Sequence, residues 1–114
     1  MATEKKALWV VFRPGKLEDL AEMRKKFTSG YSIFKEMPGL ISKCWWCNKE
    51  KGEWGAFYIF NSGEDLQAYL KSDLWTSKVP AKYGCKPQIV AILEPGPILS
   101  KTAVINGENC WISE

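Results

Sequence analysis

The 114-residue sequence contains no histidine. Catalytic triads and dyads that use an imidazole base are therefore excluded, as is a metal or haem held by histidine. Any general base must be a carboxylate, a lysine, a tyrosine, a cysteine or a bound water. Long apolar runs are also missing, since none approaches the roughly 20 residues needed to cross a bilayer.

No charge of one sign dominates the chain. The net charge is +3 and the lysines are scattered, which indicates a solvated surface and argues against nucleic-acid binding. Residues 1–6 are polar and lack the apolar core of a signal peptide. We therefore expect a cytoplasmic protein that binds neither nucleic acid nor membrane.

Residues 37–60 organise the rest of the sequence. Two runs rich in aromatic residues, 37–48 and 53–60, flank a short polar loop that contains Gly52. This pattern predicts a β-hairpin. Both runs are apolar on both faces, whereas a sheet with one wet face would alternate more cleanly. We therefore expect the hairpin to be covered on both sides.

The elements around the hairpin follow a recognisable order. An apolar run at 7–13 predicts a first strand, with Trp9 facing away from its even-numbered neighbours. A stripe of three- and four-residue steps predicts a helix over 16–36, weak near Gly30. A second helix is predicted after a cap at Asn61 or Ser62, and a last strand at 86–94. The order βαββαβ predicts an α+β, ferredoxin-like fold.

The helices of such a fold cover only one face of the sheet. Because the other face is also apolar, a second copy of the sheet is the simplest cover, which predicts a face-to-face homodimer. We expect residues 1–101 to form this domain and residues 102–114 to form a C-terminal extension.

Several segments resemble a known family. They are Pro38-Gly39-Leu40, then Lys43 and Trp45, then Gly55-Ala56-Phe57-Tyr58-Ile59-Phe60, then Leu66-Gln67-Ala68-Tyr69-Leu70. Together they resemble the YdhR-type monooxygenases of the dimeric α/β-barrel superfamily, which also contains the antibiotic-biosynthesis monooxygenases. The resemblance covers roughly residues 8–101.

The resemblance implies two ferredoxin-like subunits that form a dimeric α/β barrel, with an aromatic-lined pocket in each. It also implies a cofactor-independent monooxygenase, without metal or flavin, that acts on a hydrophobic aromatic or polyketide-like substrate. A cyclase, dehydratase or isomerase in the same pocket remains open, as does a ligand-binding protein without catalysis, because a fold does not fix a reaction.

The aromatic and cationic residues supply the candidate site. Six tryptophans are many for this length, and a flat hydrophobic ligand could stack on them. Trp9 and Trp45 are the first choices, because they sit mid-strand on neighbouring elements. Core packing is the alternative role for each. The residues predicted to bind substrate are Trp9, Trp45, Trp75, Tyr31, Tyr69 and Tyr83.

We predict Tyr58, Lys43 and Arg13 as catalytic residues. A phenol can donate a proton to a developing oxyanion, and either cation can hold an enolate or phenolate. Cys44 and Cys47 form a CxxC pattern within a predicted strand. Residues three apart on a strand lie about 10 Å apart and on opposite faces, so we expect no disulfide between them and no metal site.

Overall fold

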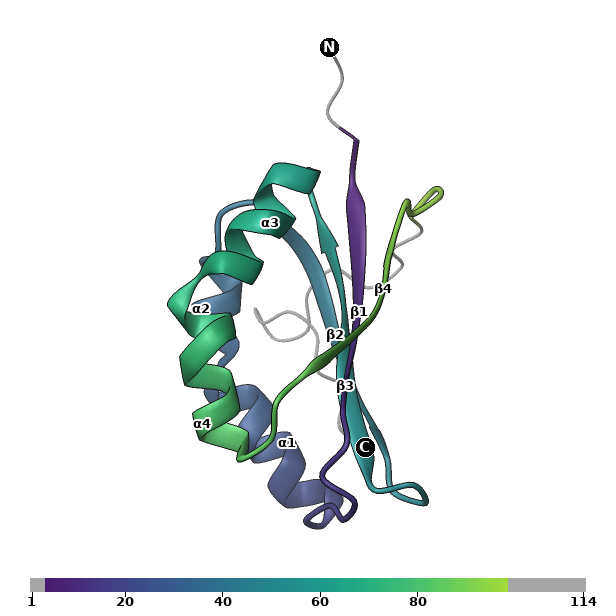
Figure 1. Cartoon of the computed structure of the whole chain (residues 1–114), viewed down its shortest axis with the longest axis vertical. Helices are drawn as coiled ribbons and strands as arrows, with labels where there is room; N and C mark the ends of the chain where they lie inside the picture. The colour runs from purple at the N-terminus through teal and green to yellow at the C-terminus, as the bar shows by residue number, and fades with distance from the viewer. Residues whose placement is uncertain (1–3, 99–114) are drawn as a thin grey trace, which may run out of the picture.

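The computed structural model describes residues 4–98, which form a four-stranded antiparallel sheet with helices packed on one face (Figure 1). The strand order in the sheet is β2-β3-β1-β4. This is the predicted ferredoxin-like α+β fold. Its strands are β1 (Lys6–Phe12), β2 (Leu40–Asn48), β3 (Glu53–Phe60) and β4 (Gln88–Leu93).

The helical layer is made of short segments. They are α1 (Leu20–Ser29), α2 (Tyr31–Lys35), α3 (Gly63–Lys71), the π-helical segment η1 (Leu74–Lys78) and α4 (Val79–Tyr83). The helix predicted over 16–36 is thus broken at Gly30, the weak point that the sequence indicates. It also begins later than predicted, because the Asp19 carboxylate accepts a hydrogen bond from the Glu22 N–H at 2.9 Å and caps α1.

Ser62 caps α3. Its hydroxyl accepts a hydrogen bond from the Asp65 N–H at 3.1 Å and donates one to the Asp65 carboxylate at 2.8 Å. Of the two predicted caps, Asn61 and Ser62, the structure uses Ser62. The acidic residues Glu64 and Asp65 in the first turn complement the positive end of the helix.

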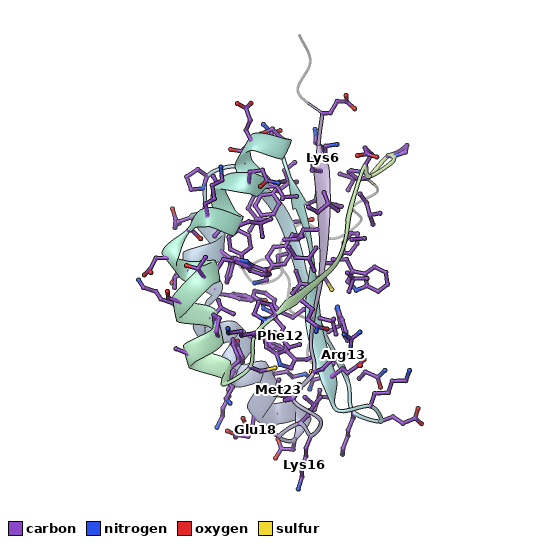
Figure 2. All side chains as sticks on the ribbon, viewed as in Figure 1. Lys6, Phe12, Arg13, Lys16, Glu18 and Met23 are labelled. Carbon is purple, nitrogen blue, oxygen red and sulfur yellow. The ribbon has the colours of Figure 1, made fainter. Side chains whose placement is uncertain are left out.

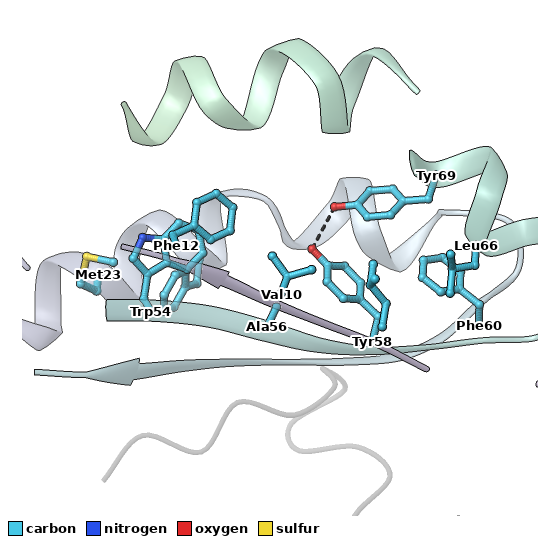
Figure 3. Close-up of a cluster of buried hydrophobic side chains, with 11 residues drawn as sticks. Val10, Phe12, Met23, Trp54, Ala56, Tyr58, Phe60, Leu66 and Tyr69 are labelled. Carbon is cyan, nitrogen blue, oxygen red and sulfur yellow. Dashed lines mark hydrogen bonds between the residues drawn. The ribbon is translucent and has the colours of Figure 1, made fainter. Parts of the chain in front are cut away.

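The hydrophobic core lies between the sheet and the helices. Alternate residues of β1 and β3 point into it, which follows from the two-residue period of a strand. Figure 3 shows these side chains against those of α1 and α3. The buried cluster consists of Leu8, Val10, Phe12, Met23, Phe27, Trp54, Ala56, Tyr58, Phe60, Leu66 and Tyr69.

The opposite face of the sheet is apolar and partly open. Trp9 is 42% exposed and pairs across the strands with Phe57, which is 37% exposed. Leu93 of β4 is 40% exposed. All the helices in residues 4–98 lie on the other face (Figure 1). We call Trp9, Phe57 and Leu93 the open face.

Arg13 directly follows β1 and lies toward the end of the molecule that carries Lys16 and Glu18 (Figure 2).

None of the helices within residues 4–98 has the length and apolarity to cross a membrane. The predicted C-terminal extension, residues 102–114, lies outside the described residues.

Candidate active site

Strand β2 carries a lysine on its helix-facing side. Lys43 pairs with Tyr58 of β3, and Trp45 pairs with Ala56. Tyr58 and Ala56 belong to the buried core, so the same register directs Lys43 and Trp45 between the sheet and the helices. An ammonium group is therefore placed where apolar side chains normally pack.

Aromatic rings surround this ammonium. The Lys43 Nζ lies 3.2 Å from the centroid of the Phe34 ring, 4.4 Å from that of Trp45 and 4.6 Å from that of Tyr58. The negative face of an aromatic ring attracts a cation at such distances. We call Lys43, Phe34, Trp45, Tyr58 and Tyr69 the Lys43 site.

The environment disfavours the charged form of Lys43. Burial is the main cause and the positive charge of Lys82 is the second, and together they hold the Lys43 pKa well below its ordinary value of 10.5. No carboxylate contributes to this shift. Lys43 as a whole residue is half-buried, whereas its ammonium lies among the rings. The neutral amine is thus available at lower pH than in an exposed lysine.

Two buried phenols lie beside Lys43. The Tyr58 and Tyr69 hydroxyls share a hydrogen bond of 2.9 Å, in which either can be the donor (Figure 3). Burial raises the pKa of Tyr58 well above 10.0, and the neighbouring Tyr69 raises it further. The pKa of Tyr69 is also raised, again mainly by burial. Both groups therefore stay neutral, and one proton of the pair is not used in their mutual bond.

Further rings extend the site along the helical layer. The Trp45 ring lies nearly parallel to those of Phe27 and Tyr31, with centroid distances of 5.8 and 5.6 Å. The Phe34 ring meets it edge-on at 5.8 Å. The ring centroid of Trp75, in η1, lies 5.4 Å from that of Tyr69. Flat rings of this kind can hold a flat ligand.

A surface groove shares one residue, Tyr69, with the Lys43 site. It has a volume of about 430 Å³, within the roughly 300–1,000 Å³ typical of small-molecule sites. Tyr69, which belongs to the phenol pair, lies between this groove and the other rings of the Lys43 site. The groove is lined by Ile33, Glu36, Met37, Pro38, Asp65, Ala68, Tyr69, Ser72 and Leu74.

The structure brings most of the predicted site residues together. Lys43, Tyr58, Trp45, Tyr31 and Tyr69 meet, with Trp75 against Tyr69. Tyr83 lies beyond them: its ring is 4.4 Å from that of Trp54, and its hydroxyl donates to the Lys26 carbonyl at 3.4 Å. Burial raises the pKa of Tyr83 to about 12.

Two predicted residues lie elsewhere. The Arg13 Nε donates to the Glu53 carboxylate at 2.9 Å, and Nη1 donates to the Gln88 side chain. Trp9 lies on the open face, whereas Trp45 faces the helices. The expectation that Trp9 and Trp45 sit on neighbouring strands is wrong, because β3 lies between β1 and β2.

Sequence reasoning missed two residues of this region. Phe34 fits the apolar stripe of the first predicted helix, which indicates a core role; in the structure it lies in α2 with its ring against the Lys43 ammonium. Lys82 carries no sequence signal that distinguishes it from the other lysines. Its charge nevertheless acts on Lys43.

The fold and the site together define a small α+β domain with a lysine enclosed by aromatic rings. The chain matches the family described as "Putative mono-oxygenase ydhR" over residues 15–93. It therefore belongs to this family. No curated protein shows a significant match to the chain.

Solved structures of low sequence identity share the fold. SnoaB from Streptomyces nogalater, described as a cofactor-independent oxygenase, is 11% identical with a TM-score of 0.61, covering 87% of this chain and 100% of its own. The NE2512 protein of unknown function from Nitrosomonas europaea is 17% identical with a TM-score of 0.64, covering 90% and 99%. Rv0793 from Mycobacterium tuberculosis is 15% identical with a TM-score of 0.56, covering 86% and 99%.

Replacing Lys43 by methionine should stabilise the protein. A buried ammonium without a carboxylate partner is costly, and a thioether of similar length keeps the ring contacts, so we expect Lys43→Met to raise the free energy of unfolding by roughly 1–3 kcal/mol near neutral pH. The unfolded chain keeps the ordinary lysine pKa of 10.5. The gain should therefore be complete below the folded-state pKa and fade as the pH approaches 10.5.

Thermal unfolding of both proteins from about pH 6 to about pH 10 measures this difference. Lys49→Met, at an exposed position in the loop between β2 and β3, is the control and should change stability little at any pH. A Lys43→Met variant that melts below the parent at neutral pH would show that the charged lysine stabilises the fold.

Proposed function

We propose that this protein is a cofactor-independent monooxygenase that acts on a hydrophobic, electron-rich aromatic or polyketide-like substrate. The observation that carries the proposal is the Lys43 ammonium, which lies among three aromatic rings beside a pair of neutral phenols. Flat apolar walls suit the substrate, and the lysine suits the negative charge that the reaction develops.

The chemistry needs no electrons from outside the substrate. Loss of a proton from an activated methylene gives a carbanion, which reduces dioxygen and bonds to it. The resulting peroxide anion takes back the proton that the substrate lost and becomes a hydroperoxide, which loses water and leaves a ketone. The net reaction converts one methylene and one dioxygen into one carbonyl and one water.

Lys43 takes the first proton in this scheme. As a neutral amine it is a base, and as an ammonium it then stands beside the substrate anion, with the ring faces of Phe34, Trp45 and Tyr58 stabilising the new charge. The hydroxyl that the Tyr58–Tyr69 pair does not use internally donates a hydrogen bond to the substrate oxygen, and both phenols stay neutral. The rings exclude water and orient the substrate.

Two comparisons support the reaction class. The family is described as a mono-oxygenase family, and SnoaB, which shares the fold, is described as a cofactor-independent oxygenase. The three described cysteines, Cys44, Cys47 and Cys85, are free thiols, which fits a cytoplasmic location.

We further propose that two copies pack through their open faces to form the dimeric α/β barrel. Trp9, Phe57 and Leu93 are exposed apolar side chains, and burying them against a second copy would favour association. Joining two sheets in this way would cover the side of each subunit that the helices leave uncovered.

The dimer can be tested by size-exclusion chromatography with light scattering. The protein should have about twice the 13.0 kDa mass of one chain. Phe57→Lys should shift it to the monomer, because it places a charge in the middle of the open face. Leu20→Lys, at an exposed apolar position of α1, should leave the dimer intact. A parent protein that elutes cleanly as a monomer would refute the dimer.

The reaction can be tested with an anthrone, whose activated methylene lies between two aromatic rings. The protein should consume dioxygen and form the quinone faster than the uncatalysed oxidation, with one atom of labelled dioxygen in the product by mass spectrometry. Lys43→Met should lower kcat/KM by about 100-fold or more, as expected for loss of a general base. Tyr58→Phe should have a smaller effect, and Lys49→Met should have none.

Because Lys43→Met is expected to be more stable than the parent, unfolding would not explain its loss of activity. Conversion of the anthrone without dioxygen uptake would instead indicate a cyclase or isomerase. Binding without any turnover, across several anthrones, would indicate a ligand-binding protein.

A further inference from the structure

The two phenols of the Tyr58–Tyr69 pair have different surroundings. Their hydroxyls lie 2.9 Å apart (Figure 3), and within residues 4–98 neither makes another hydrogen bond. Tyr58 belongs to the inner strand β3 and pairs with Leu8 on one side and Lys43 on the other. Tyr69 belongs to α3 and lines the surface groove. Only one of the two residues therefore borders a space that a ligand can enter.

This difference decides which phenol donates to the other. Two hydroxyls that share one hydrogen bond have two hydrogens, and one of these is left over. If Tyr69 were the donor, the hydrogen of Tyr58 would lie in the core with no acceptor among residues 4–98, which is costly. If Tyr58 is the donor, the remaining hydrogen belongs to the residue beside the groove. Burial thus favours Tyr58 as the donor and Tyr69 as the acceptor.

The acidities of the two phenols agree with this direction. Burial is the main cause of the raised pKa of each. Their shared hydrogen bond raises the pKa of Tyr58 further and lowers that of Tyr69. This is the pattern expected for a donor and its acceptor.

The groove beside Tyr69 suits a neutral, mostly apolar ligand. The carboxylates of Glu36 and Asp65 belong to its lining and would repel an anion. The Ser72 hydroxyl is already committed, because it donates to the Tyr69 carbonyl at 2.6 Å and accepts from the Trp75 N–H at 3.3 Å. Among these polar side chains, Tyr69 is therefore the donor for a ligand oxygen. The rest of the lining is apolar and consists of Ile33, Met37, Pro38, Ala68 and Leu74.

One wall of the groove is held by the backbone. The Asn61 N–H donates to the Gly39 carbonyl at 2.7 Å, and the Leu40 N–H donates to the Met37 carbonyl at 3.3 Å. A Cβ atom on Gly39 would lie 2.3 Å from the Asp65 Cγ, so this turn packs directly on the start of α3. A wall that is formed in advance lowers the cost of ordering the site around a ligand.

We propose that the Tyr69 hydroxyl donates a hydrogen bond to the carbonyl oxygen of a neutral, hydrophobic ligand in the groove, while Tyr58 donates to Tyr69 and holds its hydroxyl in place. The inference rests on the proposed function, because it takes this pair as the donor to the substrate oxygen. It adds which phenol meets the ligand and which ligands are recognised, namely neutral ketones and quinones.

Packing is the other role that the pair can have. In that role the two phenols join α3 to β3, and the loss of either hydroxyl changes stability without changing the choice between ligands. The choice between two ligands is therefore the quantity to measure.

Two naphthalene probes test this choice. In 2-acetylnaphthalene and 2-isopropenylnaphthalene the shape is nearly the same, and a carbonyl oxygen in the first replaces a methylene in the second. Calorimetry and tryptophan fluorescence should show that the ketone binds about five- to tenfold more tightly, as expected for one hydrogen bond between neutral groups. The anion 2-naphthoate should bind more weakly than the ketone, because Glu36 and Asp65 repel it.

Variants assign the preference to one phenol. Tyr69→Phe should abolish the preference for the ketone, whereas Tyr58→Phe should keep most of it, because the Tyr69 hydroxyl remains. Thr76→Val, which removes an exposed hydroxyl of η1 outside the groove lining, is the control and should leave the preference unchanged.

Melting temperatures give a second readout that does not depend on a ligand. Tyr69→Phe should melt below Tyr58→Phe, because it leaves the buried hydrogen of Tyr58 without an acceptor. The double variant should melt above Tyr69→Phe, because that hydrogen is then absent. Equal binding of ketone and hydrocarbon by the parent, a preference that survives in Tyr69→Phe, or no binding of either probe would overturn the proposal.

The binding assay needs no turnover, so it is separable from the test of oxygenation. A preference for the ketone that Tyr69→Phe removes, with no dioxygen uptake from any anthrone, would refute the proposed reaction and keep the role of Tyr69. Dioxygen uptake by a protein that binds the ketone and the hydrocarbon equally would refute the role of Tyr69 and keep the reaction.

Discussion

The proposed chemistry of this protein depends on one contact, the ammonium of Lys43 against the faces of three aromatic rings. The alternation of β2 directs the side chain into the helix-facing layer, where a charge is unfavourable and its pKa falls. The rings offset part of this cost. Because burial disfavours the charged form of Lys43, its ammonium releases a proton more readily than that of an exposed lysine. Shifted pKa values of this kind are common in active sites.

The break in the first helical region lies next to this contact. At Gly30 the chain ends α1 and begins α2, which brings Tyr31 against Trp45 and Phe34 against Lys43. The same region receives Lys82 from α4. A short stretch between two helices thus joins rings of α2 to β2 and also holds a second cation through Ser29.

Much of the fold could be predicted from local patterns. The hairpin, the order of elements, the weak point at Gly30 and the cap at Ser62 follow from residue types and spacing. Strand alternation also predicts that Cys44 and Cys47 face opposite sides. The hydrogen bonds of Lys82 to the end of α1 could not be predicted, because they join elements far apart in sequence. The faces of Trp9 and Trp45 likewise depend on the strand order, which places β3 between them.

The protonation of Lys43 tests this account most directly. Titration of the lysine side chains by NMR, with Lys43 assigned through Lys43→Met, would measure its pKa alongside those of the other lysines. The account predicts a Lys43 pKa well below 10.5, and lower than that of exposed Lys49 in the same spectra. A Lys43 that titrates with the exposed lysines would mean that its ammonium is solvated, and the site would lose its base.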